Sequence, residues 1–183
     1  MHKARVKFNY HDYLHLTEEK RYELIEGDLY MVPSPSINHQ RVSRNIFELL
    51  LDHVRKNMLG EVLYAPCDVV LSDEDVFQPD ILFVSKERSL IIKELCIKGP
   101  PDLVIEILSP STAERDLSIK KKLYFKFGVK EYWVVDIEAR KVEVMIMGEE
   151  GFETLRIFSE ESHLRSHLIK DLNIDARNIF SAK

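Results

Sequence analysis

The sequence is poor in cysteine and has no long apolar run, and each shortage excludes a class of protein. Its two cysteines, Cys67 and Cys96, form no Cys-x-x-Cys pair, so neither a zinc site nor a disulfide framework is indicated. No apolar run approaches the length of a membrane span, and the N-terminal segment MHKARVKFNYHDY lacks the apolar core of a signal peptide. We therefore expect a soluble, cytoplasmic protein with no membrane partner.

The sequence also has fewer basic than acidic residues. The 183 residues carry a net charge of −5, whereas binding to nucleic-acid phosphates normally requires a positive surface. Basic residues do cluster locally, at Arg41 with Arg44 and at Lys120, Lys121 and Lys122, and a bound divalent metal would offset acidic charge at a site. Charge alone therefore neither establishes nor excludes a nucleic-acid partner. At 45% hydrophobic, the chain can bury one sizeable core, which predicts a single domain over residues 1–183.

The hydrophobic patterning predicts an α/β fold with a mixed central β-sheet flanked by helices and preceded by a β-hairpin. Residues 22–32 alternate around a Glu-Gly-Asp turn, which predicts the hairpin, with Gly27 at its tip. Helical spacing predicts an amphipathic helix from about residue 39 to 56 and a second over 112–127, closed by Gly128. Strands are expected at residues 61–73, 78–85, 101–109, 131–137, 141–147 and 152–158.

One acidic residue lies inside a strand that is otherwise apolar. Glu106 is surrounded by Val, Ile, Ile and Leu in the segment VIEIL. A carboxylate in such a strand is costly to bury unless a partner compensates its charge. Asp80 repeats the pattern, because it follows Pro79 and leads directly into the apolar segment ILFV. A Pro-Asp pair often only caps a turn. If the two strands are neighbours, however, both carboxylates converge on one point, where Mg²⁺ or Mn²⁺ would neutralise them.

The helix after Glu106 offers a cation. At 3.6 residues per turn, Lys120 lies on one stripe with Leu117 and Tyr124, whereas Lys121 and Lys122 lie off it. Lys120 either extends past its neighbours to water or directs its ammonium toward Glu106. Asp116 lies one turn earlier and would form an i,i+4 pair that orients Lys120.

An Asp, a Glu and a Lys at one edge of a sheet suit metal-dependent hydrolysis of a phosphodiester. The carboxylates hold the metal, which activates a water and stabilises the charged phosphorus centre. The lysine positions that water or helps to deprotonate it.

Four ordered motifs at this point resemble a known family. The segments QPD, PDLVIEILSPST, RDLxxKxxLY and GVKEYWVVD resemble the putative restriction endonuclease domain family, which belongs to the PD-(D/E)XK nuclease superfamily. The resemblance extends from YELIEGDL through VVD. It implies a restriction-endonuclease-like fold and a Mg²⁺-dependent endonuclease that acts on DNA.

The resemblance makes Asp80 the aspartate of the PD element and Glu106 the acidic residue of the (D/E)XK element. The sequence departs from the superfamily at the third position, where Leu108 replaces the lysine. The resemblance implies that the lysine has moved to the next helix, where Lys120 stands. The helical stripe led to the same residue without the family.

Three further residues have weaker claims on the site. Glu23, in the hairpin, matches a glutamate of the family and is either a metal or water ligand or an exposed strand charge. His39 either contacts phosphate or caps the early helix, and the cap is the favoured reading. Tyr124 either hydrogen-bonds into the site or only packs in the core, and core packing is the more common case.

The sequence thus predicts metal-dependent endonuclease activity on DNA through Asp80, Glu106 and Lys120. A catalytically inactive nuclease fold that serves as a DNA-binding or interaction module stays open, because of Leu108 and the net acidity. A nuclease that acts on RNA or another phosphodiester also stays open, because such a centre contacts the phosphate and not the base. Cutting both strands of a duplex would need two active sites, which makes a homodimer a further expectation.

Overall fold

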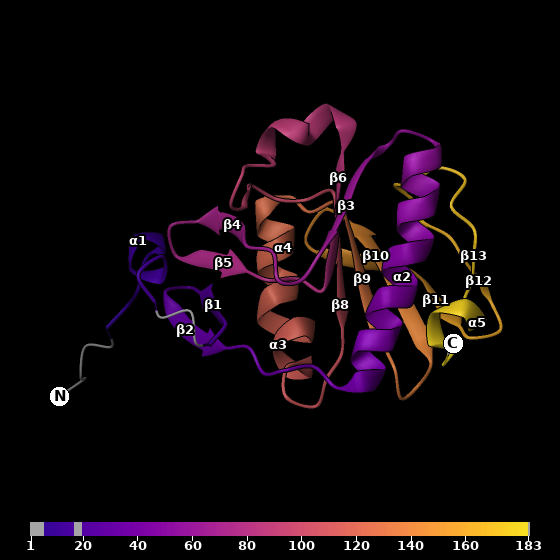
Figure 1. Ribbon diagram of the computed structural model, residues 1–183, viewed down its shortest axis with the longest axis horizontal. Helices are drawn as coiled ribbons and strands as arrows, with labels where there is room; N and C mark the ends of the chain where they lie inside the picture. The colour runs from indigo at the N-terminus through magenta and orange to yellow at the C-terminus, as the bar shows by residue number, and fades with distance from the viewer. Residues whose placement is uncertain (1–5, 17–19, 183) are drawn as a thin grey trace.

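The computed structural model describes residues 6–16 and 20–182, and its framework is a six-stranded mixed sheet (Figure 1). The strand order is β11-β10-β9-β8-β6-β3, with β8 and β9 parallel and every other neighbouring pair antiparallel. Its strands are β3 (Gly60–Tyr64), β6 (Ile81–Ser85), β8 (Leu103–Ile107), β9 (Glu131–Asp136), β10 (Lys141–Met147) and β11 (Phe152–Ser159).

A second, five-stranded sheet contains the N-terminal hairpin, in the order β2-β1-β5-β4-β7. Its strands are β1 (Tyr22–Ile25), β2 (Asp28–Met31), β4 (Val69–Ser72), β5 (Asp75–Phe77) and β7 (Ile97–Lys98). The predicted hairpin is confirmed. Glu26 and Gly27 both have positive φ, 49° and 76°, as a two-residue turn matched to the twist of the strands requires.

Two of the expected strands differ from the structure, and one of them is divided between the sheets. The segment expected as one strand over 61–73 forms β3 in the large sheet and β4 in the small one, with Pro66 between them. The segment over 78–85 begins only at Ile81, after Pro79. Proline lacks the N–H that a sheet interior needs, so both breaks fall where the backbone cannot continue the ladder.

Helices cover both faces of the large sheet (Figure 1). On one face lies α2 (Ile37–Lys56), whose Val42, Ile46, Leu50 and Val54 pack against the strands. On the other face, Leu123 and Tyr124 of α4 (Lys121–Phe127) pack against Val104 and Tyr132. The predicted fold class, a mixed sheet flanked by helices, is confirmed.

The remaining elements are short. They are α1 (Tyr10–Tyr13), a 3₁₀ helix (Lys86–Ile91), α3 (Ala113–Arg115), a π-helical turn (Asp116–Lys120), the pair β12 (His163–Leu164) and β13 (Ile174–Asp175), and α5 (Arg177–Phe180). In the part of the chain that the structure covers, no helix combines the length and the apolar character needed to cross a bilayer.

Candidate active site

The alternation of β8 places Glu106 on the face that the second helical segment covers. Leu103, Ile105 and Ile107 join the core beneath α2, whereas Val104 belongs to the core beneath α4. Glu106 shares the α4 face with Val104 because successive side chains of a strand point to opposite faces. Glu106 is 3% exposed, and the Tyr124 hydroxyl donates a hydrogen bond of 2.8 Å to its Oε1. Tyr124 is therefore both a core residue and a hydrogen-bond donor to the site.

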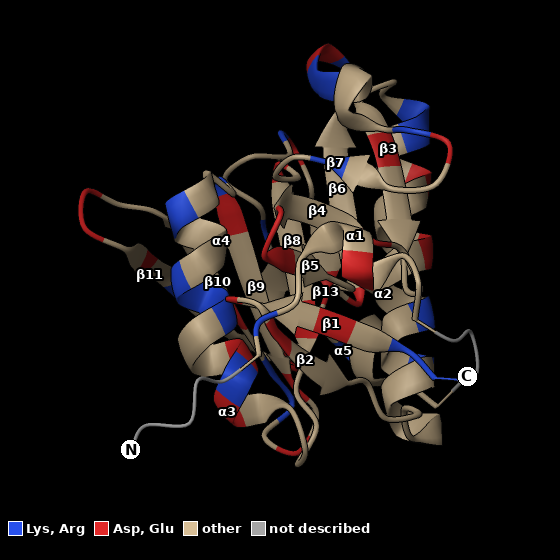
Figure 2. Ribbon diagram, turned by 90° about the vertical axis from the view of Figure 1, so that its left-hand side faces the viewer, with Lys and Arg blue, Asp and Glu red and all other residues tan. Residues whose placement is uncertain are grey.

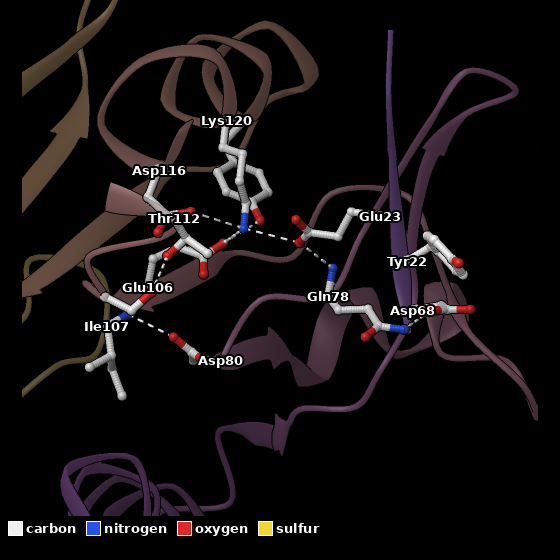
Figure 3. Close-up of polar contacts among 12 residues, drawn as sticks. Tyr22, Glu23, Asp68, Gln78, Asp80, Glu106, Ile107, Thr112, Asp116 and Lys120 are labelled. Carbon is white, nitrogen blue, oxygen red and sulfur yellow. Dashed lines mark hydrogen bonds and ion pairs between the residues drawn. The ribbon is translucent and has the colours of Figure 1, made fainter. Parts of the chain in front are cut away.

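Lys120 forms an ion pair with Glu106, which is one of the two alternatives that the sequence left open for this lysine. Its Nζ lies 2.6 Å from Glu106 Oε1, 3.2 Å from Asp116 Oδ1 and 3.0 Å from Glu23 Oε1 (Figure 3). All four side chains are at most 6% exposed. One buried ammonium thus bridges three buried carboxylates, and we call these four residues the Lys120 cluster. The alternative in which Lys120 reaches water is wrong.

The helix that carries Lys120 is less regular than its sequence predicted. Residues Asp116–Lys120 form a π-helical turn between α3 and α4, and this wider turn shifts the buried stripe. Leu117, expected on the stripe, is 47% exposed, while Asp116 takes the inward position and is buried. The i,i+4 pair of Asp116 with Lys120 is confirmed.

Glu23 joins the cluster from the hairpin, 97 residues away in sequence. Its side chain is 6% exposed, so the reading as an exposed strand charge is wrong. The backbone N–H of Gln78 also donates a hydrogen bond of 3.0 Å to Glu23 Oε1. Glu23 therefore ties β1 of the small sheet to the helix that covers the large one.

Asp80 lies beside Glu106 because of strand register. Strands β6 and β8 are antiparallel with Ile81 opposite Ile105, and continuing that register brings Asp80 opposite Glu106. The backbone N–H of Ile107 donates a hydrogen bond of 2.7 Å to Asp80 Oδ2 (Figure 3). Asp80 therefore directly precedes the strand that pairs with β8, next to Glu106, and the sharing of one metal ion by the two carboxylates stays a prediction.

His39 does not cap α2. The cap is Ser36, whose Oγ accepts a hydrogen bond of 3.1 Å from the backbone N–H of His39. The buried imidazole points instead toward the sheet, with Nε2 3.2 Å from Asp80 Oδ2 and 3.1 Å from the carbonyl oxygen of Ile107. The cap reading is wrong because a serine three residues earlier already satisfies the helix end.

Burial dominates the electrostatics of the site. Burial raises the pKa of Glu106 well above its usual value, although Lys120 acts to lower it. Burial also raises the pKa of Asp116, against the opposing effect of Lys120. Burial would lower the pKa of Lys120, but Glu106 and Glu23 outweigh it and raise that pKa well above the usual range. Lys120 therefore stays an ammonium ion at neutral pH.

His39 responds to its carboxylate neighbour in a similar way. Burial acts to lower the pKa of His39, but the hydrogen bond and the charge of Asp80 outweigh burial and raise it. The same contact, 3.2 Å from His39 Nε2 to Asp80 Oδ2, holds the Asp80 carboxylate in place, and it is a charge-assisted hydrogen bond whenever the imidazole is protonated.

Two residues near the site were not identified from the sequence. Gln78 precedes the PD element, and its Nε2 donates a hydrogen bond of 2.8 Å to Asp68 Oδ1. The Tyr132 hydroxyl donates a hydrogen bond of 3.0 Å to the carbonyl oxygen of Asp116, and its ring packs at a tilt of 52° against that of Tyr124. The motif QPD contained the glutamine, but no local pattern indicates which long-range partner it meets.

These side chains line a cavity of about 890 Å³ between the hairpin, α2 and the helix of Lys120. Glu23, His39, Asp80, Glu106, Asp116 and Lys120 all line it. Exposed lysines of α4 lie on the outer side of that helix instead, as the blue bands of Figure 2 show. The structure therefore separates the buried cluster from the solvent-facing charge of the same helix.

The mixed sheet with helices on both faces is a restriction-endonuclease-like fold. Comparison with known proteins agrees with that class. The family described as putative restriction endonuclease (Uma2) matches residues 10–177, and the chain belongs to this family.

Two relatives lie at low sequence identity. An uncharacterized protein of Synechocystis sp. is 25% identical over 136 residues, which cover 72% of this chain and 76% of that protein. The crystal structure of a putative nuclease belonging to DUF820 from Anabaena variabilis superposes with a TM-score of 0.79 at 20% identity. That superposition covers 94% of this chain and 97% of the Anabaena chain and confirms the fold.

Proposed function

We propose that this protein hydrolyses phosphodiester bonds of DNA with Mg²⁺ or Mn²⁺ bound by Asp80 and Glu106. The observation that supports the proposal is the β6–β8 register: Ile81 is opposite Ile105, so the preceding residue Asp80 is expected beside Glu106, and both residues line the cavity. The Lys120 ammonium 2.6 Å from Glu106 supports the same reaction, as does the family to which the chain belongs.

The donor chemistry fits a hard divalent cation. Glu23, Asp80, Glu106 and Asp116 place four carboxylates around the site, whereas Lys120 and His39 are its basic groups. Within the described ranges, no three His, Cys, Asp or Glu side chains form a ready-made metal cluster. Asp80 and Glu106 are therefore the two protein ligands that we assign to the ion, and water would complete its shell.

The bound ion would polarise the phosphodiester and lower the pKa of an attacking water. Lys120, kept protonated by its carboxylates, acts by stabilising negative charge and positioning the water rather than by removing its proton. Glu23 and Asp116 fix the direction of the ammonium, and His39 fixes Asp80. Lys120 therefore does not act as a general base, because a lysine in that role would need a lowered pKa.

The test is incubation with plasmid DNA, linear DNA and RNA in the presence of Mn²⁺, Mg²⁺ or EDTA. We expect cleavage of DNA with either metal and none with EDTA. Asp80→Asn should abolish cleavage, while Asp52→Asn, at an exposed position of α2, serves as a matched control and should retain it. Undiminished cleavage by Asp80→Asn would refute the proposed site.

The lysine needs its own test because Leu108 occupies its usual position. Lys120→Ala should lower the single-turnover rate about 10²- to 10⁴-fold, the range for one electrostatic or acid–base group. The exposed Lys122→Ala variant should leave that rate unchanged. Lys120→Arg should not restore it fully, because a planar guanidinium cannot replace a compact ammonium.

A catalytically inactive DNA-binding module is the second candidate, and Leu108 favours it. Binding of DNA without cleavage in any metal would establish this alternative, whereas preferential cleavage of RNA would establish a ribonuclease. Cleavage of both strands at one position would call for a pair of sites, so the homodimer is tested by the sedimentation coefficient of the active protein.

A further inference from the structure

The cavity has an aromatic wall that the proposed chemistry does not use. Phe47 of α2 and Tyr64 at the end of β3 both line it. Their ring centroids are 4.5 Å apart and their planes meet at 64°, an edge-to-face pair. Phe47 packs against the core, whereas Tyr64 is 56% exposed. The tyrosine ring therefore rests against a partly buried neighbour and remains accessible.

Strand register places this wall next to the proposed metal ligand. Tyr64 pairs with Ile81, and the backbone N–H of Ala65 donates a hydrogen bond of 3.0 Å to the carbonyl oxygen of Asp80. Neighbouring strands lie about 4.8 Å apart. A base on a nucleotide adjoining the reacting phosphate would thus be within reach of the tyrosine ring.

The charge of the cavity disfavours a substrate held mainly by its phosphates. Seven carboxylates line the cavity against four lysine and arginine side chains. Lys120 is one of those four, and its ammonium is engaged by three carboxylates. Because electrostatic attraction is limited, affinity for a nucleic acid has to come from other contacts, and base stacking on an aromatic ring is one that tolerates any sequence.

Stacking also discriminates between paired and unpaired bases. Inside a duplex, both faces of a base are covered by its neighbours in the stack, so a side chain reaches a face only after the base is unpaired or turned out. An exposed ring beside the reacting phosphate therefore favours a strand without a partner.

We propose that Tyr64, supported by Phe47, stacks on an unpaired base next to the scissile phosphate. The preferred substrate is then DNA that is single-stranded at the point of cleavage. This inference rests on the proposed function, because it assigns the reacting phosphate to Asp80 and Glu106.

Binding is tested without cleavage, in EDTA, by fluorescence anisotropy with a labelled single-stranded DNA oligonucleotide and with the duplex of the same sequence. Tyr64→Ala should weaken binding of the single strand about 5- to 150-fold and of the duplex far less, while Tyr64→Phe should bind like wild type. Phe125→Ala is the matched control: it removes an edge-to-face partner of Phe152, at 5.9 Å, outside the cavity, and should bind like wild type. Equal losses for single strand and duplex, or no loss, would overturn the proposal.

Cleavage gives an independent readout. With Mn²⁺, single-stranded DNA should be cleaved faster than duplex. An abasic nucleotide beside the cleaved phosphate should lower the cleavage rate of the wild type, but it should not lower the rate of Tyr64→Ala any further. Duplex cut as fast as single strand would overturn this inference and leave the proposed function intact. No cleavage of any substrate would refute the proposed function, while the anisotropy comparison would still decide whether Tyr64 stacks. Preference for an RNA oligonucleotide would overturn the assignment to DNA.

Discussion

Replacing Lys120 tests the most unusual feature of the structure, one ammonium shared by three buried carboxylates. The side chain of Lys120 is 4% exposed, and those of Glu23, Glu106 and Asp116 are 3–6% exposed. Lys120→Ala leaves three carboxylates without their cation. Removing one partner of a buried ion pair costs about 3–5 kcal/mol, because the remaining charge stays buried and unpaired. For a chain of this length, that loss lowers Tm by about 6–20 °C.

The loss should depend on pH in a defined direction. Burial already raises the pKa of Glu106, and without Lys120 nothing in the cluster opposes that rise. A carboxyl whose pKa is higher in the folded than in the unfolded state binds its proton more tightly when folded. Its protonation therefore adds stability that is fully present below the unfolded pKa and is lost as pH rises through the folded pKa. The Tm difference between Lys120→Ala and wild type should shrink from about pH 8 to about pH 5.

Differential scanning calorimetry of purified protein measures both effects. Lys122→Ala, at an exposed position of the same helix, should melt with wild type. Adding Glu23→Gln to Lys120→Ala should recover part of the loss, because it removes one of the uncompensated charges. A Lys120→Ala protein that melts within about 2 °C of wild type at neutral pH would refute the reasoning, since it would show that the carboxylates do not require the ammonium.

Three further outcomes are expected. Mn²⁺ should raise Tm, because a ligand bound only by the folded state stabilises it, and Asp80→Asn should abolish the rise; an unchanged Tm together with no heat of metal binding would contradict the site. Burial raises the pKa of the Cys67 thiol to about 11. Iodoacetamide at about pH 8 should therefore alkylate Cys67 far more slowly in the folded protein than in protein unfolded by urea. Mass spectrometry follows the alkylation, and equal rates in the two states would contradict the prediction. Burial acts to raise the pKa of Asp102, but Lys130, the Ser85 amide and Arg88 outweigh it and lower it. Asp102→Asn should therefore lower stability by about 1–3 kcal/mol at neutral pH and cost less as pH falls through the folded pKa of Asp102, which urea titrations at two pH values would show or refute.

Local patterns in the sequence were enough to predict most of the elements. The hairpin around Gly27, the amphipathic α2 and the strand that contains Glu106 each follow from turn chemistry or from a period of 3.6 or 2. These signals work because they depend on residues within a few positions of one another. They failed at Pro66, where one expected strand is divided between the two sheets, and at Pro79, where the expected strand begins three residues late.

The sequence also indicated which charged residues, just before β6, within β8 and in the following helix, belong to the site. Asp80 and Glu106 stood out because a carboxylate is costly in an apolar strand, and Lys120 because it lay on a buried stripe. The conflict between residue type and surroundings is visible without a structure.

Only the tertiary structure decided the remainder of the site. Glu23 reaches Lys120 across 97 residues, and His39 reaches Asp80 because α2 crosses the same sheet. The π-helical turn moved Asp116 inward and Leu117 outward, which a period of 3.6 cannot anticipate. These contacts depend on how sheets and helices pack, and packing is set by the whole core. The sequence therefore shows which charged residues would be costly to bury without a partner. Which residues become their partners is decided only when distant segments of the chain pack together.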